Sequence, residues 1–182
     1  DDPNVANPFA FPLVTTTYYL ATTNDTCSGL DSITIVVNAA PPANAGPDIE
    51  ICIGDASQLL ATGGVGYVWT PSDSLSDPNI DNPLAWPIDT TTYVVEVTDA
   101  LGCTATDSMD VIVNPLPNAF AGNDTTICTG DTIQLNASGG QTYVWTPNTD
   151  ISDPNIADPD VWPVVTTEYV VQVTDSNTCV NK

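Results

Sequence analysis

The chain has 182 residues and carries 23 acidic side chains against one basic side chain, Lys182, so its formal net charge is −22 at pH 7. This charge excludes nucleic acid as a partner, because binding to a phosphate backbone needs clustered lysines and arginines. Histidine and arginine are absent and the lone lysine comes last, so the usual general bases and oxyanion-binding groups of enzymes are missing. We therefore expect a protein that is not an enzyme.

The residue pattern predicts strands throughout. Short runs of Val, Ile, Thr, Tyr and Trp alternate with clusters of Gly, Pro, Asn and Asp, which is typical of an all-β protein. We find no long helical periodicity and no apolar stretch long enough to span a bilayer.

One stretch, residues 44–119, recurs almost intact 76 positions later. Glycines, aromatic residues and cysteines return in the second copy at the same spacing. The repeated residues are Asp48, Cys52, Gly54, Asp55, Gly63, Gly64, Trp69, Pro71, Asp77, Trp86, Tyr93, Asp99 and Cys103, which return as Asp124, Cys128, Gly130, Asp131, Gly139, Gly140, Trp145, Pro147, Asp153, Trp162, Tyr169, Asp175 and Cys179. A unit of this size is small for a self-sufficient core, so we expect it to need covalent support.

The repeat divides the chain into three parts. Residues 1–43 match the C-terminal part of a β-sandwich repeat, residues 44–119 form a complete repeat, and residues 120–182 form a repeat that lacks its last strand. This frame indicates a segment of a longer tandem array. We expect each partial repeat to be completed by neighbouring chain, either continuous with it or from another subunit.

In chain order, the first part should contain strands at residues 15–23 and 33–37. For the complete repeat, the pattern predicts strands at residues 49–53, 57–61, 67–69, 84–88, 91–98 and 104–113. Trp69 is expected to fill the core of a sandwich, and Tyr93 begins its strand at the position of a tyrosine-corner residue. The linkers at residues 38–44 and 114–118 are short and Pro-rich, so the repeats should form a stiff rod.

Several of these motifs together resemble a known family. They are residues 44–48 (NAGPD), 51–55 (ICIGD), 67–71 (YVWTP), 90–99 (TTTYVVEVTD) and 102–103 (GC). In this order and spacing they resemble the PKD-like and immunoglobulin-like tandem repeats of very large surface proteins of Bacteroidota, which include gliding-motility adhesins exported by type IX secretion. The resemblance implies tandem immunoglobulin-like β-sandwich modules in a rod-like array.

The five cysteines allow two regular pairings. In the preferred one, Cys52 bonds Cys103 and Cys128 bonds Cys179 within modules, and Cys27 pairs outside the sequence. First and last strands of a sandwich can lie side by side, whereas links between modules would leave each small core without a staple. The alternative joins Cys27 to Cys52 and Cys103 to Cys128 between neighbouring modules. Either pairing indicates an oxidising compartment.

Calcium is the cofactor that the acidic residues suggest. Asp77, Asn79 and Asp81 alternate as the oxygen ligands of many calcium loops do, but the following glycine and later glutamate of an EF-hand are missing. The next repeat offers Asp153 and Asn155, with its third carboxylate displaced. The alternative is that these side chains cap turns in a Pro-rich loop.

Sugar attachment is a further possibility. Six Asp-Ser/Thr-apolar triplets resemble the acceptor of O-glycosylation in Bacteroidota, although each residue could equally be an ordinary turn or strand residue. The candidate acceptors are Ser32, Ser74, Thr90, Ser108, Thr125 and Thr132.

The sequence thus favours a structural segment of a long extracellular or cell-surface repeat protein that forms a fibre, stalk or adhesin shaft. Its partners would be neighbouring repeats or like subunits. One alternative is a module that binds surface polysaccharide through Trp86 and Trp162, which would then lie exposed in a row. Another is the spacer region of a secreted enzyme.

Overall fold

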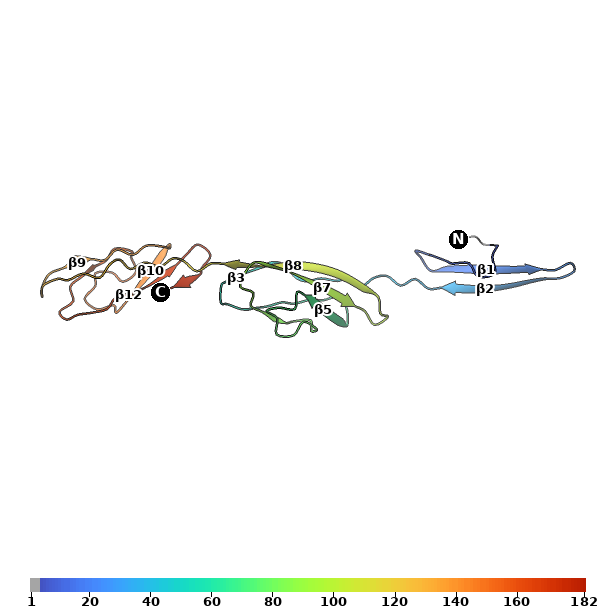
Figure 1. Ribbon diagram of the computed structural model, residues 1–182, viewed down its shortest axis with the longest axis horizontal. Helices are drawn as coiled ribbons and strands as arrows, with labels where there is room; N and C mark the ends of the chain where they lie inside the picture. The colour runs from blue at the N-terminus through green and yellow to red at the C-terminus, as the bar shows by residue number, and fades with distance from the viewer. Residues whose placement is uncertain (1–3) are drawn as a thin grey trace.

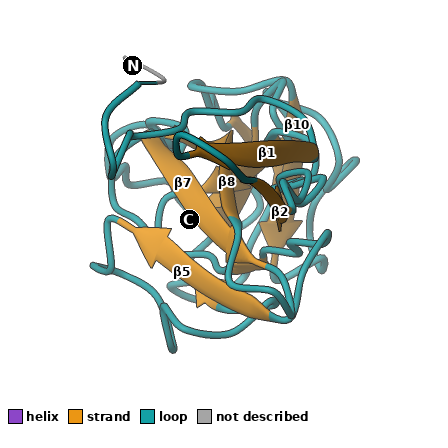
Figure 2. Cartoon of the chain, turned by 90° about the vertical axis from the view of Figure 1, so that its right-hand side faces the viewer, coloured by secondary structure: helices purple, strands orange, loops and turns teal. Residues whose placement is uncertain are grey.

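The computed structural model describes residues 4–182, which form three parts arranged along one axis (Figure 1). The N-terminal hairpin, the middle module (residues 44–119) and the C-terminal module (residues 120–182) follow one another along this axis. Seen from the hairpin end, they lie one behind another (Figure 2). Residues 4–182 contain strands and turns and no helix, so they contain no helix that could cross a membrane.

The N-terminal hairpin consists of β1 (Thr16–Thr23) and β2 (Ser28–Ile35), which pair antiparallel along their whole length. The first strand was predicted within one residue. The second begins earlier than predicted and ends earlier, because every residue from Ser28 onward has a partner on β1. Apolar side chains on both strands, among them Leu20, Leu30 and Ile33, are exposed.

The middle module is a sandwich of two sheets. One has the order β3-β8-β7-β5 and the other pairs β4 with β6. The strands are β3 (Ile49–Cys52), β4 (Ser57–Gln58), β5 (Gly66–Thr70), β6 (Leu84–Ala85), β7 (Thr91–Thr98) and β8 (Thr104–Asn114). All six were predicted, although β4 and β6 are shorter than expected. The first and last strands lie side by side, and they run parallel.

The core of this module is built on alternating residues of β7. Tyr93, Val95 and Val97 are fully buried, as a half-buried strand requires. Trp69 is 1% exposed and its Nε1 donates to the carbonyl of Ile80 at 3.0 Å, which confirms it as the core aromatic.

Tyr93 anchors the loop that crosses one end of the core. Its hydroxyl donates to the carbonyl of Asp73 at 3.2 Å, in the manner of a tyrosine corner. Burial first, and the nearby Asp73 carboxylate second, raise the pKa of Tyr93 above its ordinary value. With this loop, the buried Trp69 and the two facing sheets, the middle module is an all-β, immunoglobulin-like sandwich, as predicted.

The C-terminal module repeats this plan with less sheet. Its strands are β9 (Ile133–Gln134), β10 (Thr142–Thr146), β11 (Asp160–Val161), β12 (Val170–Thr174) and β13 (Val180–Asn181). Trp145 is 2% exposed and its Nε1 donates to Ile156 at 3.0 Å, as Trp69 does to Ile80. The peptide bonds before Pro71 and Pro147 are both cis.

The repeated glycine pairs let each linker pass close to its module. Gly63 has a φ of +111°, and a Cβ there would lie 2.1 Å from the carbonyl oxygen of Pro42. Gly139 has a φ of +107°, and its Cβ would lie 2.0 Å from the carbonyl oxygen of Asn118. Only glycine fits at such an approach and at such a φ.

Candidate functional site: the junction between modules

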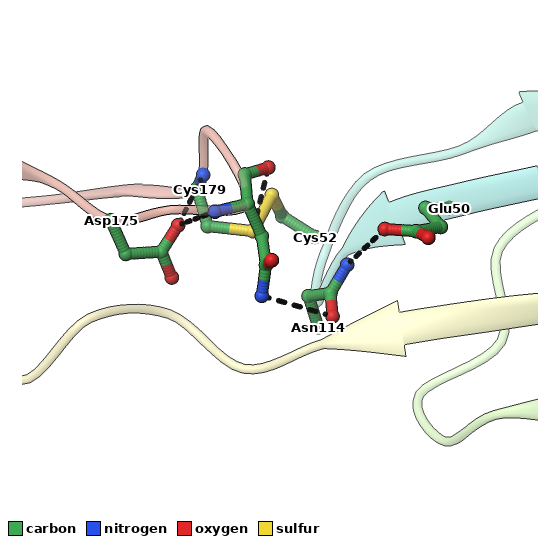
Figure 3. Close-up of a disulfide and its surroundings, with 6 residues drawn as sticks. Glu50, Cys52, Asn114, Asp175 and Cys179 are labelled. Atoms are coloured by element: carbon green, nitrogen blue, oxygen red, sulfur yellow. Dashed lines mark hydrogen bonds between the residues drawn. A yellow bond between two sulfur atoms is a disulfide. The ribbon is translucent and has the colours of Figure 1, made fainter.

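The junction between the middle and C-terminal modules is closed by a disulfide between Cys52 and Cys179 (Figure 3). The two Cα atoms are 5.5 Å apart, although the residues are 127 positions apart in the sequence. Cys52 ends β3, and Cys179 lies in the turn that joins β12 to β13. The bond therefore ties one module to the next.

The predicted pairs Cys52–Cys103 and Cys128–Cys179 are wrong. Because β3 runs parallel to β8, Cys52 lies beside Asn114 at the end of β8, whereas Cys103 directly precedes its first residue. A strand of this length separates the two cysteines by about 35 Å, and a disulfide needs Cα atoms within about 7 Å. The predicted adjacency of first and last strands was right, but their parallel direction puts the cysteines at opposite ends.

The alternative pairs, Cys27–Cys52 and Cys103–Cys128, are also wrong. They would join neighbouring modules, and the disulfide in the structure does join neighbouring modules. The structure joins the first cysteine of one module to the second cysteine of the following module. Among the described residues, Cys27, Cys103 and Cys128 form no disulfide.

A hydrogen-bonded turn presents Cys179 to the junction. The Asp175 carboxylate Oδ1 accepts the backbone N–H groups of Asn177 at 2.8 Å and Cys179 at 2.9 Å. The N–H of Asp175 donates to the carbonyl of Cys179 at 3.1 Å, and Thr178 has a φ of 65°.

On the other side of the disulfide, Cys52 also lies in a turn. Gly54 has a φ of 93° and Asp55 N–H donates to the carbonyl of Cys52 at 2.9 Å. Both cysteines thus sit in turns fixed by backbone geometry.

Polar side chains surround the disulfide. Asn177 Nδ2 donates to Asn114 Oδ1 at 3.2 Å, and Asn114 Nδ2 donates to Glu50 Oε2 at 3.3 Å. Asn181 Nδ2 donates to the carbonyl of Pro117 in the linker at 2.9 Å. Cys179 itself is fully buried. The linker, the end of the β3–β8 pair and the turn of the next module are therefore held together by both covalent and hydrogen bonds.

Sequence reasoning did not single out these asparagines. Asn114 and Asn181 are ordinary strand-end residues in the pattern, and Asn177 stands where the preceding repeat has Leu101. The available signal was positional: Cys52 lies near the end of a predicted strand and Cys103 precedes one. With the first and last strands parallel, that placement sends the two cysteines to opposite ends of the module.

The predicted calcium ligands close their own turns. Asp77 Oδ1 accepts the N–H of Asn79 at 2.9 Å and its Nδ2 at 3.3 Å, and Asp153 and Asn155 repeat these contacts at 2.9 and 3.2 Å. The side chain of Asp81 is exposed. Within residues 4–182, no three acidic or sulfur side chains converge as a metal site would require. Calcium binding stays a prediction.

The candidate glycosylation acceptors differ in exposure. Ser32, Thr90, Ser108, Thr125 and Thr132 are exposed. Ser74 is half-buried, has a φ of 59°, and its carbonyl accepts the N–H of Trp86.

Trp86 and Trp162 stand outside the two cores. They are 43% and 42% exposed, in contrast to the buried Trp69 and Trp145. The matched exposure follows from their equivalent places beside the short strands β6 and β11.

A groove of about 840 Å³ opens along one side of the C-terminal module. It lies between residues 121–129 and 163–169, with Trp145 and Leu135 among its lining residues. In the middle module the equivalent segments flank β8, which pairs with both β3 and β7. The short strand β13 pairs with β12 as the first residues of β8 pair with β7. The groove therefore lies where the rest of β8 runs in the middle module.

No family model matches the chain, and no curated protein matches it. Among solved structures, the IG1+IG2 segment of DIP-gamma is similar over 79% of this chain and 94% of that one, with 10% identity and a TM-score of 0.39. The insect immune protein hemolin is similar over 81% of this chain and 49% of its own, with 13% identity and a TM-score of 0.37. The N-terminal eight immunoglobulin domains of the Down syndrome cell adhesion molecule are similar over 92% of this chain and 27% of that one, with 16% identity and a TM-score of 0.35. Likenesses this distant carry no functional argument.

Proposed function

We propose that the chain is a structural, non-enzymatic segment of an extracellular shaft, in which β-sandwich modules are joined end to end into a fibre, stalk or adhesin. The observation that carries this proposal is the disulfide between Cys52 and Cys179, because it locks two successive modules to each other. The hydrogen bonds from Asn177 and Asn181 to the end of the middle module and to the linker support it. A junction secured in this way resists bending and pulling.

The setting we propose is the surface of a bacterium of the Bacteroidota, as part of a large secreted repeat protein of the gliding-adhesin kind. Support comes from the repeated sequence motifs and from the disulfide, which is typical of proteins outside the reducing cytosol. The net charge of −22 suits a surface-exposed polymer that must not aggregate.

Single-molecule pulling tests the shaft role. With force applied at the two ends, tension passes through the disulfide and bypasses the chain between Cys52 and Cys179. The two bypassed modules should then add almost no length. After reduction, 127 residue steps enter the path, worth about 440 Å of contour length at roughly 3.5 Å per residue.

The matched control is the double substitution Cys52→Ser with Cys179→Ser, which should give the longer contour under both oxidising and reducing conditions. If the unsubstituted chain shows equal contour lengths in the two conditions, the junction carries no tension and the shaft proposal fails.

Calcium and glycans are two further features that we propose for the shaft. Repulsion among 23 acidic side chains would be relieved by calcium at loops such as that of Asp77 and Asn79. A lower melting temperature in chelator at moderate salt would support calcium binding, and an unchanged melting temperature would oppose it.

For glycans, intact-mass measurement of native material would report the mass of any sugars attached to the exposed acceptors.

A second candidate function is binding of polysaccharide, for which Trp86 and Trp162 are the observation. Two half-exposed indoles at equivalent places can stack on sugar rings. Replacing both with alanine should abolish retardation of the chain in a gel that contains cell-surface polysaccharide, while Thr91→Ala should not. Unchanged retardation in the double variant would remove this candidate.

A further inference from the structure

The two cysteines of the junction disulfide differ in their access to solvent. Cys179 is fully buried, in a turn where the carboxylate of Asp175 accepts its N–H at 2.9 Å. Cys52, at the end of β3, is partly exposed. The rate at which a thiolate opens a disulfide depends on which sulfur it can reach. A thiolate from solvent therefore reaches this bond at Cys52 and not at Cys179.

A cavity of about 390 Å³ at the junction gives access to Cys52, which is one of its lining residues. Glu50 and Asn114 line it from the middle module, and Asn177 lines it from the C-terminal module. Figure 3 shows Glu50 and Asn114 on the side of Cys52 that points away from Cys179. A water molecule takes about 30 Å³ in the liquid, so the cavity admits a thiol of a few heavy atoms. A folded protein reductase is too large to enter.

The walls of this cavity carry negative charge. Glu50 and Asp55 both line it, and both side chains are exposed. Lys182, the one basic residue of the sequence, does not line it. Carboxylates around an opening lower the local concentration of anions, and an attacking thiolate is itself an anion. A thiol that carries its own ammonium group offsets the thiolate charge and avoids this repulsion.

We propose that this cavity is a reaction site at which a small aminothiol opens the Cys52–Cys179 disulfide by attack on Cys52. The ammonium group of the aminothiol faces Glu50 and Asp55, and its sulfur faces Cys52. Opening the bond releases the lock between the two modules, so the site softens the shaft. This role rests on the proposed function, whereas the reaction itself depends only on the disulfide and the cavity.

The bond opens by thiol–disulfide exchange, with the aminothiol as the reductant. Its thiolate attacks Sγ of Cys52, a bond forms between these two sulfur atoms, and the bond to Sγ of Cys179 breaks. Cys179 leaves as a thiolate and takes a proton from water. A second aminothiol attacks the sulfur of the first and releases Cys52 as a thiolate. One protein disulfide is thus reduced by two electrons, and two aminothiols are oxidised to one small disulfide.

The two modules stay in contact after the first step. The hydrogen bonds from Asn177 to Asn114 at 3.2 Å and from Asn181 to the linker at 2.9 Å do not involve sulfur. The Cys179 thiol therefore stays beside Cys52, where it attacks the mixed disulfide and restores the original bond. We expect the first step to reverse when the aminothiol is removed.

The first test identifies the sulfur that is attacked. The triple variant Cys27→Ser, Cys103→Ser and Cys128→Ser keeps only the junction pair, whose bond is verified by peptide mapping before use. It is treated with cysteamine, the reaction is stopped with acid at early times, and free thiols are alkylated after unfolding. Mapping should find cysteamine on Cys52 and the alkyl group on Cys179, in large excess over the reverse. The unsubstituted chain should give the same assignment.

A second test measures the selection by charge. Cysteamine, 2-mercaptoethanol and mercaptoacetate are similar in size, and their thiolate forms are neutral overall, singly negative and doubly negative. Each rate constant is expressed per thiolate and divided by the rate with an uncharged small disulfide, which removes differences in intrinsic reactivity. The normalised rate should fall by about fivefold for each added negative charge at low salt. The differences should shrink at high salt, which screens the carboxylates.

Substitutions that remove charge assign this selection to the cavity. Glu50→Gln with Asp55→Asn should bring the three normalised rates close together. The matched control is Glu96→Gln with Asp25→Asn, which removes the same charge from exposed positions outside the cavity. It should leave the selection unchanged, which separates the local field from the net charge of the chain. Mapping of the junction disulfide shows that each variant is folded at the junction.

Three results would overturn the proposal. These are cysteamine found mainly on Cys179, an opening rate that does not depend on thiol concentration, and a selection by charge that is absent or survives the loss of Glu50 and Asp55. The second result would mean that the bond opens only after unfolding. The shaft proposal would survive each of them, because it depends on tension through the intact bond. Equal contour lengths in the pulling experiment would instead remove the shaft proposal and leave this reaction unaffected.

Discussion

Leu59 and Tyr93 are fully buried in the middle module, whereas their counterparts Leu135 and Tyr169 are half-buried in the C-terminal module. The two modules share the motifs that build the core, including the buried tryptophan and its hydrogen bond. The difference lies in one strand. The middle module has the 11-residue β8 between β3 and β7, whereas the C-terminal module has only the two-residue β13 beside β12 and a groove beyond it.

The shortening of this strand also changes its neighbours. β12 begins at Val170, three residues later than its counterpart β7, and the segment equivalent to β3 is not a strand. A strand is defined by its hydrogen-bonded partner, so nearly the same residues form a strand in one module and a loop in the other. The comparison teaches that one central strand sets the burial and the strand lengths around it.

The largest expected effect comes from removing the core tryptophan. Trp69→Ala should destabilise the middle module by about 3–5 kcal/mol, as expected for a large aromatic in a closed core. Trp145→Ala should destabilise the C-terminal module by less. Trp145 lines the open groove, so the space that its side chain leaves joins the groove and is not a closed cavity. Hydrogen exchange, read separately for each module, measures both losses. Equal losses would mean that the groove does not weaken the core.

Next in size is the close approach of the linkers. Gly63→Ala should destabilise by about 2–3 kcal/mol, since its Cβ would overlap the Pro42 carbonyl and its φ is unfavourable for alanine. Gly139→Ala should cost the same, because both modules keep this contact. The control is Gly54→Ala. Gly54 has a φ of +93°, but no atom lies within 4 Å of the added Cβ, so this substitution should destabilise the middle module by only about 1 kcal/mol. Unequal effects at Gly63 and Gly139 would show that the two linkers pack differently.

A peptide with the sequence of residues 107–114, the part of β8 that follows the positions equivalent to residues 180–182, should fill the groove of the C-terminal module. Its alternating apolar residues, such as Met109 and Val111, are buried in the middle module and would face Trp145. At 100 times its dissociation constant, the peptide would stabilise this module by about 2.7 kcal/mol. Thermal melting measures the shift. A peptide with serine at the apolar positions should give none, and equal stabilisation by both peptides would contradict strand insertion.

The smallest expected effect is a pH dependence confined to the middle module. Asp107 Oδ2 accepts the N–H of Ala45 at 2.9 Å, and this bond first and the N–H of Ser108 second lower the pKa of Asp107. Since the folded pKa lies below the unfolded value of about 3.9, the stabilisation is complete above that value and is lost as pH falls through the folded pKa. Asp107→Asn should lower the free energy of unfolding near neutral pH and make it depend less on pH below about pH 4. If the pH dependence below that value is unchanged in the variant, other carboxylates cause the loss of stability in acid.

Most of the middle module could be predicted from its residues. The strand at residues 91–98 matches β7 because period-two alternation reports burial on one face, and Trp69 is the core aromatic that its place on an early strand indicated. The all-β class likewise follows from local pattern. The second strand of the hairpin was predicted less well, since its start depends on pairing with β1.

The sequence by itself determined the repeat, its period, the buried aromatic residues and the acidic character, because each of these is a local or periodic property of the chain. Only the tertiary structure decided the disulfide, since Cys52 can bond Cys179 rather than Cys103 only when β3 runs parallel to β8 and its end meets the next module. Equal spacing in the sequence fits several pairings. Strand direction and the stacking of modules are long-range properties, and they bring two cysteines 127 residues apart within bonding distance.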